Sequence, residues 1–172
     1  MKEITLIVGG AKSGKTKLAL KKLLEHQGPK FYLATCPRID DEMDEKIKNH
    51  QTERLGHNIE TIEEESDLRA VIEKTLPGEA ILIDCLTLWI NNLIFHKKIN
   101  NEKELEDLII KTFSTHKSKL FIVTNEVGNG LVPIQKESRI YRDLLGKANQ
   151  VLAELSDKVI LVSCGLPLQL KG

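Results

Sequence analysis

The sequence predicts an α/β domain in which a mostly parallel β-sheet lies between two layers of helices. Short apolar runs of strand length alternate along the chain with stretches that have the period and length of helices. The apolar runs are nearly continuous, which is typical of parallel strands buried on both faces. The first run leads directly into a glycine-rich turn and then into a helical pattern, the connection that repeats in doubly wound folds.

Each predicted element has its own stretch of sequence. Buried strands are expected at residues 4–8, 31–35, 80–84, 120–124 and 159–163, with a short additional strand at 59–62. Helices are expected at residues 15–26, 41–55, 66–76, 86–96, 102–116 and 136–155. No repeat, low-complexity stretch or linker interrupts this order, so we expect residues 1–172 to form a single domain.

Composition argues against several classes of protein. Lysine plus arginine and aspartate plus glutamate number 25 each, and a net charge of zero gives no general attraction to nucleic acid or anionic membranes. No segment approaches the roughly 20 apolar residues of a membrane span, and residues 4–8 are too short for a signal peptide. Cys36, Cys85 and Cys164 form no CxxC pair, which indicates reduced thiols rather than a zinc site. We therefore expect a cytoplasmic protein with no nucleic-acid partner and no membrane span.

The glycine-rich turn carries the signature GxxxxGK[ST] of a phosphate-binding P-loop. It consists of Gly9, Gly10, Ala11, Lys12, Ser13, Gly14, Lys15 and Thr16. Its place between a predicted strand and a predicted helix is the context that the motif requires. The glycines let backbone N–H groups surround phosphate oxygens, and the helix N-terminus adds a favourable dipole. The fold class is therefore a P-loop NTPase-type three-layer sandwich that binds a nucleoside triphosphate.

Three side chains are expected to act on the phosphates and their metal ion. Lys15 should reach the β- and γ-phosphates, and Thr16 should hold Mg²⁺ or a similar divalent cation. Asp84 ends the apolar run at residues 80–84, and a carboxylate at that place in P-loop proteins supports Mg²⁺, often through water. The alternative for Asp84 is a cap on the helix that begins near Leu86.

A second group of reactive side chains lies in the predicted helix at residues 41–55. Met43, Ile47, His50 and Arg54 are spaced 4, 3 and 4 residues apart, which puts them on one stripe of a helix. A histidine can act as a nucleophile or carry a proton, and an arginine can bind phosphate through two hydrogen bonds. The pattern alone nevertheless favours an ordinary, half-buried histidine at His50.

A third group follows the predicted strand at residues 120–124. Residues 124–133 contain two glycines and a proline, and they form a loop at the carboxyl end of a strand, where α/β sheets bind ligands. The helix after this loop is amphipathic. Its expected buried side consists of Ile140, Leu144, Ala148, Val151, Leu152 and Leu155. Its other side consists largely of Arg139, Arg142, Asp143, Gly146, Asn149 and Gln150, and composition favours a solvated face there.

Together these blocks resemble one known family, the bifunctional adenosylcobinamide kinase / adenosylcobinamide-phosphate guanylyltransferases of cobalamin biosynthesis. The matching segments are, in order, GGAKSGKT, FYLATCPRIDDEMDEKIKNHQTER, DCLTLWINNL, TNEVGNGLVP, RIYRDLLGKANQ and CGLPLQLK. They cover nearly the whole chain. A P-loop alone occurs in many proteins, whereas NEVGxGxVP followed by RxxRDxxGxxNQ is far more specific.

The resemblance implies two successive reactions. The γ-phosphoryl group of ATP or GTP passes to the hydroxyl of adenosylcobinamide, and GMP then passes from GTP to the new phosphate, giving adenosyl-GDP-cobinamide and pyrophosphate. Members of the family hold the GMP on a histidine, which maps to His50 here and reverses the first interpretation of that residue. Lys15 and Arg54 are the further catalytic groups. The family also implies a homotrimer.

The resemblance also implies nucleotide contacts beyond the P-loop and Asp84. These contacts are Ala34, Thr35, Cys36, Gln51, Thr52, Glu53, Arg54 and Glu63. Several positions depart from the commonest pattern of the family, namely Lys12, Lys46, Asn58 or Ile59, and Glu65. None of these departures removes a chemical group that the mechanism needs, although the guanine contacts near residues 58–65 stay open.

Two other functions remain compatible with the residues themselves. One is a small-molecule P-loop kinase that transfers a phosphoryl group directly, without a covalent intermediate. The other is a nucleotide-dependent switch ATPase, which would need a partner and no acceptor. A stripe that joins His50 to Arg54, in a chain with a P-loop, favours the guanylyltransferase.

Overall fold

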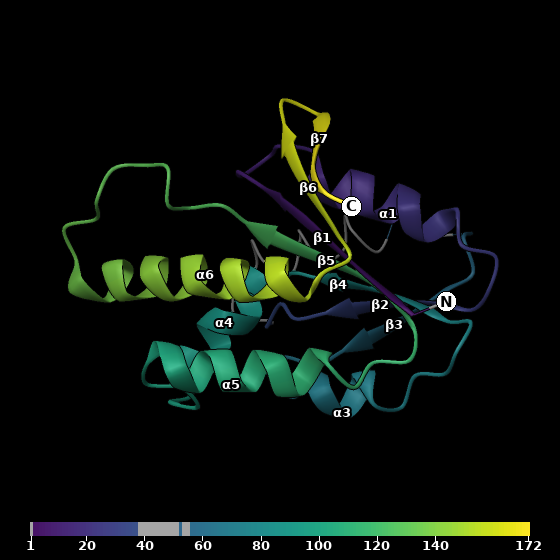
Figure 1. The fold of residues 1–172 in the computed structure, drawn as a ribbon, viewed down its shortest axis with the longest axis horizontal. Helices are drawn as coiled ribbons and strands as arrows, with labels where there is room; N and C mark the ends of the chain where they lie inside the picture. The colour runs from purple at the N-terminus through teal and green to yellow at the C-terminus, as the bar shows by residue number, and fades with distance from the viewer. Residues whose placement is uncertain (1, 38–51, 53–55) are drawn as a thin grey trace.

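The computed structural model describes residues 2–37, 52 and 56–172, and within them the strands form one sheet (Figure 1). The order of the seven strands is β3-β2-β4-β5-β1-β6-β7. Their bounds are β1 Glu3–Gly9, β2 Lys30–Ala34, β3 Ile59–Glu63, β4 Ala80–Asp84, β5 Lys119–Asn125, β6 Lys158–Ser163 and β7 Leu166–Lys171. All neighbouring strands are parallel except β6 and β7, which form an antiparallel hairpin.

The described helices cover both faces of this sheet. Their bounds are α1 Lys15–Leu24, α3 Leu68–Ile72, α4 Leu86–Phe95, α5 Glu102–Phe113 and α6 Lys136–Leu155. In Figure 1, α1 lies on one side of the sheet, and α3, α4, α5 and α6 lie on the other side. This arrangement confirms the predicted three-layer α/β sandwich. No described helix is long and apolar enough to cross a membrane.

Each face of the sheet has its own hydrophobic core, because successive side chains of a strand point to opposite faces. In β1, Leu6 and Val8 pack with the four-helix side, whereas Ile7 packs with α1. On the four-helix side, the rings of Trp89 and Phe113 meet edge to face at 6.1 Å between centroids and join α4 to α5. The continuous apolar character of the strands therefore follows from burial on both faces, as the sequence predicted.

The predicted strands all appear, including the short one that became β3, but several boundaries differ. Helix α1 ends at Leu24 and α3 covers only Leu68–Ile72, so both are shorter than predicted. Strand β7 was not predicted at all. It lies at the edge of the sheet, is exposed along its length and contains Pro167, which a central strand does not tolerate. The predicted helix at residues 41–55 lies outside the described residues apart from Thr52, which is helical.

Candidate nucleotide-binding site

The turn between β1 and α1 has the backbone of a closed phosphate cradle. Gly14 adopts a φ of +95°, and Lys12 adopts a φ of +55°. The N–H of Ser13 donates to the carbonyl of Gly10 at 3.2 Å and closes the turn. A side chain at position 9 would place its Cβ 2.5 Å from both the Ser13 hydroxyl oxygen and the Val162 carbonyl oxygen. Gly9 is therefore required by close approach, and Gly14 by its left-handed conformation.

The hairpin of β6 and β7 supports this cradle from the side. The N–H of Gly165, in the hairpin turn, donates to the carbonyl of Ser13 at 2.9 Å. A Cβ on Gly14 would come within 3.3 Å of the Gly165 Cα. The C-terminal strands thus contact the outer side of the P-loop and help to fix its shape.

Lys15 begins α1 and points back across the cradle. Its Nζ donates to the carbonyl of Gly10 at 3.0 Å. Burial lowers the pKa of Lys15, while the nearby Cys85 and Asp84 act in the opposite direction. A desolvated ammonium gains stability from an anion placed beside it. The cradle is therefore built to receive negatively charged phosphate.

Asp84 faces this lysine from the end of β4. Its Oδ2 accepts a hydrogen bond from the hydroxyl of Tyr32, a residue of β2 that is only 4% exposed. The residue at the N-cap of α4 is Cys85, and it makes no side-chain cap hydrogen bond. Asp84 is thus held by a neighbouring strand rather than used to cap α4, which removes the alternative considered from the sequence.

The ends of β2 and β4 are joined by a second set of hydrogen bonds. The Thr35 hydroxyl donates to the Cys85 carbonyl at 2.7 Å and accepts from the Cys85 N–H at 3.0 Å. Asn92 of α4 donates to the carbonyls of both Thr35 and Glu65 at 2.9 Å. Because Thr35 is fully buried, it lies beneath the surface of the site. Burial, and then the charge of Asp84, raise the pKa of Cys85 to about 12, so this thiol stays protonated.

Three predicted contact residues line up across neighbouring strand ends. Ala34 of β2 is in register with Glu63 of β3 on one side and with Asp84 of β4 on the other. Cys36 follows just beyond β2 and is partly buried. The remaining residues predicted from the family resemblance, namely His50, Gln51, Glu53 and Arg54, lie outside the described residues. Thr52 is described and exposed.

Two polar residues of this edge, Tyr32 and Asn125, were given no role of their own by the sequence analysis, which placed Asn125 only within the predicted ligand-binding loop at residues 124–133. Asn125 is the last residue of β5, the strand between the P-loop strand β1 and the Asp84 strand β4. Its N–H donates to the Thr87 hydroxyl at 2.8 Å, and its carbonyl accepts from Asn149 of α6 at 3.0 Å. The available signal was its position, a polar residue that ends a buried strand directly before a loop with two glycines.

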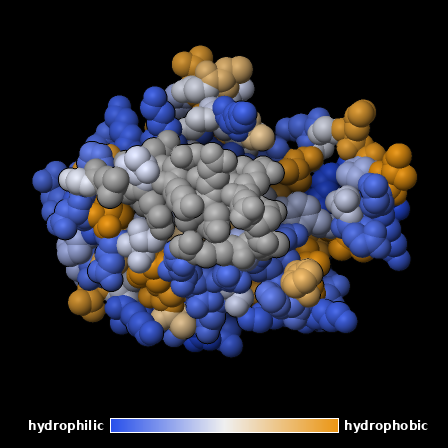
Figure 2. Space-filling view, turned by 180° about the vertical axis from the view of Figure 1, so that it is seen from behind, coloured by the Kyte–Doolittle hydropathy of each residue, from blue (hydrophilic) through white to orange (hydrophobic). Residues whose placement is uncertain are grey.

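The loop between β5 and α6 begins in the site and ends far outside it. The N–H of Glu126 donates to the Gly9 carbonyl at 3.1 Å, which ties the start of the loop to the P-loop. Further along, Leu131 is 96% and Ile134 is 92% exposed. Arg139 of α6 donates to the carbonyl of Ile134 at 2.5 Å and holds the returning chain. Figure 2 shows this loop projecting at the right of the molecule with hydrophobic side chains on it.

Helix α6 corrects two expectations about its faces. Ile140, predicted to be buried, is 43% exposed, because the first turns of α6 extend past the sheet (Figure 1). Asn149, predicted on the solvated face, is buried and donates to β5. Its Oδ1 accepts from the Thr124 hydroxyl at 2.8 Å, so both ends of this amide are satisfied by the sheet.

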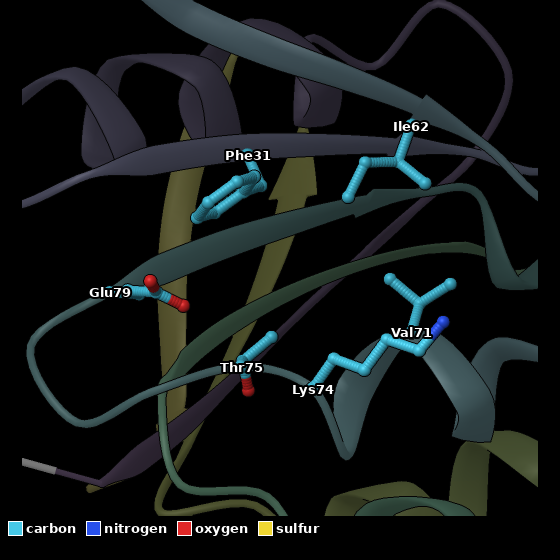
Figure 3. A pocket seen from close by; sticks show the side chains of 6 residues that line it. All are labelled: Phe31, Ile62, Val71, Lys74, Thr75 and Glu79. Atoms are coloured by element: carbon cyan, nitrogen blue, oxygen red, sulfur yellow. The ribbon is translucent and has the colours of Figure 1, made fainter.

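A separate cavity of about 250 Å³ lies between β2, β3 and α3 (Figure 3). Phe31, Ile62 and Val71 give it an apolar lining. Of its polar lining residues, Thr75 bonds Ser118 at 3.0 Å and Glu79 accepts from the Leu76 N–H at 2.8 Å, and Lys74 is the third. None of the residues that line this cavity belongs to the P-loop, so it is distinct from the nucleotide-binding edge.

The donor set at the P-loop edge fits magnesium better than a transition metal. Among the described residues no cluster of three or more His, Cys, Asp or Glu side chains is placed to hold a metal ion. Mg²⁺ needs few protein ligands, because phosphate oxygens and water fill most of its octahedral shell. The Thr16 hydroxyl and the Asp84 carboxylate are hard oxygen donors of the kind that it prefers.

Fold and site together define a P-loop nucleotide-binding protein. Two solved structures share this fold: a flagellar accessory protein, FlaH, from Methanocaldococcus jannaschii, with a TM-score of 0.52 and 13% identity, and a protein of Pyrococcus horikoshii, PH0250, with a TM-score of 0.57 and 11% identity. The match with FlaH covers 98% of this chain and 78% of FlaH. The match with PH0250 covers 99% of this chain and 86% of PH0250. At these identities the likeness concerns the fold alone.

Sequence comparison is more specific. Residues 5–170 match the model of a family described as cobinamide kinase / cobinamide phosphate guanyltransferase. The bifunctional adenosylcobalamin biosynthesis protein CobP of Pseudomonas aeruginosa is 35% identical over 97% of this chain and 96% of its own length. CobU of Salmonella typhimurium, described in the same words, is 34% identical over 96% of this chain and 98% of its own. The chain belongs to the cobinamide kinase / cobinamide phosphate guanyltransferase family, as its resemblance predicted, and is a transferase of cobalamin biosynthesis.

Proposed function

We propose that this enzyme phosphorylates adenosylcobinamide with ATP or GTP and then transfers GMP from GTP to the phosphate, giving adenosyl-GDP-cobinamide. The observation that carries the proposal is the desolvated Lys15 of a closed P-loop, beside Asp84, in a chain that matches this family over residues 5–170. The Lys15 side chain would bind the β- and γ-phosphates. The surrounding backbone cradle would consist of Gly9, Gly10, Ala11, Lys12, Ser13, Gly14 and Thr16.

In the first reaction the enzyme mainly positions the nucleotide and neutralises the charge of its phosphates. The acceptor hydroxyl attacks the γ-phosphorus, and the bond to the bridging oxygen breaks with its electron pair left on the nucleoside diphosphate. Lys15 stabilises the negative charge that develops on the phosphates. Thr16 and Asp84 would hold Mg²⁺, which supplies further neutralisation of the phosphate oxygens when bound.

In the second reaction His50 would act as the nucleophile. Its neutral imidazole attacks the α-phosphorus of GTP, a P–N bond forms, and pyrophosphate leaves with the electron pair of the broken P–O bond. The phosphate of the acceptor then displaces the imidazole. Two displacements replace one difficult step, and Arg54 would neutralise charge on the phosphate. These two roles rest on the family resemblance, because both residues lie outside the described part of the chain.

The remaining nucleotide contacts are proposed on the same ground. They are Ala34, Thr35, Cys36, Gln51, Thr52, Glu53 and Glu63. Of these, Thr35 would act by fixing the ends of β2 and β4, since its hydroxyl is bonded to Cys85 in both directions. Residues 1–172 would form one catalytic domain, located in the cytoplasm and assembled as a homotrimer, as in the family.

The test is to incubate the enzyme with GTP labelled in the α-phosphate and Mg²⁺, and then to denature it. We expect protein-bound label that survives alkali and is released by mild acid, the stability of a phosphoramidate. His50→Ala should abolish the label but retain γ-phosphoryl transfer to adenosylcobinamide, which needs no covalent intermediate.

His57→Ala is the matched control, and it should keep the label. Label mapped to Lys12, Lys15 or another histidine would refute the role of His50 while leaving the family assignment intact. If no adduct forms and only the γ-phosphoryl group moves, the enzyme is a simple P-loop kinase. If nucleotide is hydrolysed without transfer to any corrinoid acceptor, the switch ATPase alternative holds.

A further inference from the structure

Asn125 occupies the most central position at the carboxyl edge of the sheet. Its strand, β5, lies between β1, which leads into the P-loop, and β4, which ends at Asp84. Asn125 is in register with Gly9, and Asp84 is in register with Val123 of the same strand. An amide at this position therefore stands between the phosphate cradle and the proposed metal-supporting carboxylate.

The alternation of the strand directs this amide toward the P-loop side of the sheet. Phe121 and Val123 pack in the core that faces α1, together with Ile7 and Leu82. Residue 125 continues the same alternation and so shares that face. Thr124 points the opposite way, where its hydroxyl bonds Asn149 of α6. The side chain of Asn125 is thus on the same face as α1 and Lys15.

The backbone of Asn125 is fixed while its side chain is not used. Its backbone N–H donates to Thr87 of α4, and its backbone carbonyl accepts from Asn149 of α6. By contrast, Oδ1 is buried without a hydrogen-bond partner, and Nδ2 makes no hydrogen bond to the described residues. A buried, unsatisfied amide oxygen costs on the order of 1–3 kcal/mol. The NH₂ group, unpaired among the described residues and carried by a fixed backbone, is therefore the part of the side chain that can donate to a ligand, whereas the enclosed Oδ1 is not.

The two amide atoms differ in what they can do. Oδ1 is enclosed by protein, so the NH₂ group is the end that can meet a ligand in the cradle. An NH₂ group donates hydrogen bonds, and the ligand of a P-loop is rich in acceptor oxygens. Because Lys15 extends from the start of α1, it would reach the phosphates from the α1 side, and a donor at the end of β5 would contact the terminal phosphoryl group from the sheet side.

We propose that Asn125 is a catalytic residue whose Nδ2 donates a hydrogen bond to an oxygen of the γ-phosphoryl group during its transfer. This inference rests on the proposed function for the molecule that receives the phosphoryl group, adenosylcobinamide. The contact between Asn125 and the γ-phosphoryl group does not depend on which molecule receives it. As the acceptor oxygen bonds to phosphorus and the bridging bond breaks onto the nucleoside diphosphate, the hydroxyl proton passes to water. Asn125 neither gives nor takes a proton, and acts by stabilising charge on the transferred group.

The first test compares Asn125→Ala with the wild type in single-turnover formation of nucleoside diphosphate, with and without cobinamide. Removal of one preorganised donor to a transition-state oxyanion slows a reaction on the order of 10²–10³-fold. We expect a loss of at least about tenfold, with nucleoside triphosphate affinity within about threefold of the wild type. The melting temperature should stay the same or rise, because the substitution removes an unsatisfied buried atom and keeps both backbone hydrogen bonds.

The second test does not need turnover. Affinity for Mg²⁺, nucleoside diphosphate and aluminium fluoride, which mimics the transferred phosphoryl group, is measured by calorimetry. Asn125→Ala should weaken binding of this combination at least about tenfold and leave binding of the diphosphate alone unchanged. Asn125→Asp, which keeps the shape but replaces the donor with a negative charge, should weaken it at least as much.

Several results would overturn the proposal. Unchanged rates and unchanged aluminium fluoride affinity in both variants would show that the amide does not contact the phosphoryl group. A loss confined to nucleotide affinity, or one that follows a fall in melting temperature, would make Asn125 a binding or structural residue. If the wild type forms diphosphate without phosphorylating cobinamide, the proposed function has failed, while the comparison between Asn125→Ala and the wild type still decides the inference.

Discussion

At the scale of single residues, the site consists of side chains whose placement costs stability. Lys15 is half-buried and its charge is desolvated, and Asn125 keeps an unpaired oxygen within the protein. Ser13 also has a buried hydroxyl without a hydrogen-bond partner. Desolvated charges and unpaired buried polar atoms of this kind are typical of functional sites.

Replacement of Lys15 by alanine should reduce nucleotide turnover by roughly 10²-fold or more, because the phosphates lose their cationic partner. Folding should be nearly unaffected, since the Nζ makes one hydrogen bond to the described residues, to the Gly10 carbonyl. Turnover and the melting temperature are measured on the same preparation. Lys17→Ala, an exposed lysine of the same helix, is the control and should behave as the wild type.

Replacement of Tyr32 by phenylalanine should raise the Mg²⁺ concentration needed for half-maximal activity by roughly tenfold, as expected for loss of a group that orients a metal-supporting ligand. Nucleotide binding without metal should change little. Asp84→Asn should produce a larger shift in the same direction. Tyr141→Phe is a matched control, because its hydroxyl donates to the Thr87 carbonyl at 3.1 Å instead. Indistinguishable Mg²⁺ titrations for Tyr32→Phe and the wild type would reject this role.

At the scale of elements, the site depends on hydrogen bonds that cross from helices to strand ends. Asn92 of α4 holds the chain after β2, Thr87 of α4 holds the end of β5, and Asn149 of α6 holds β5 from the other face. The hairpin of β6 and β7 contacts the P-loop through Gly165. Helices thus determine where the strand ends lie, and the strand ends present the functional groups.

The link between α6 and β5 can be measured through Asn149. Alanine at this position would leave the Thr124 hydroxyl and the Asn125 carbonyl without a bond inside the protein. We expect a loss of about 1–3 kcal/mol in the free energy of unfolding, measured by urea denaturation. Gln150→Ala, the exposed neighbour, should change it by less than about 0.5 kcal/mol. Equal stability of the Asn149→Ala variant and the wild type would contradict the contacts described.

At the scale of the whole molecule, an ion cluster joins three neighbouring strands, β5, β1 and β6, at the end of the sheet opposite the site. Glu3 of β1 bonds Lys158 of β6 at 2.9 Å and Lys119 of β5 at 3.1 Å. Burial raises the pKa of Glu3, but the hydrogen bonds and charges of Lys158 and Lys119 outweigh it and lower the pKa below 4.5. A carboxyl group with a lowered pKa contributes stability above its unfolded pKa and loses it as the pH falls through the folded value.

Stability should therefore decrease as the pH falls below about 4.5, and part of this decrease belongs to Glu3. Glu3→Gln should lower the free energy of unfolding at pH 7 by roughly 1 kcal/mol or less, because the pair is only partly buried. The difference between variant and wild type should shrink toward pH 3. Unfolding is followed by circular dichroism across this range. A difference that is constant with pH would exclude the ion pairs as its cause.

The sequence by itself determined the α/β class, the P-loop and the family. Those properties depend on local order along the chain: the continuous apolar runs, the spacing of GxxxxGK[ST], and blocks such as TNEVGNGLVP. Only the tertiary structure decided that Tyr32 bonds Asp84, that Asn149 faces inward and that Asn125 stands between the P-loop and Asp84. The reason is physical: the sheet order places β5 between β1 and β4, and no local pattern encodes which distant strands become neighbours. Strand β7 was missed for a related reason, since an exposed edge strand carries no burial pattern and is defined by its pairing with β6.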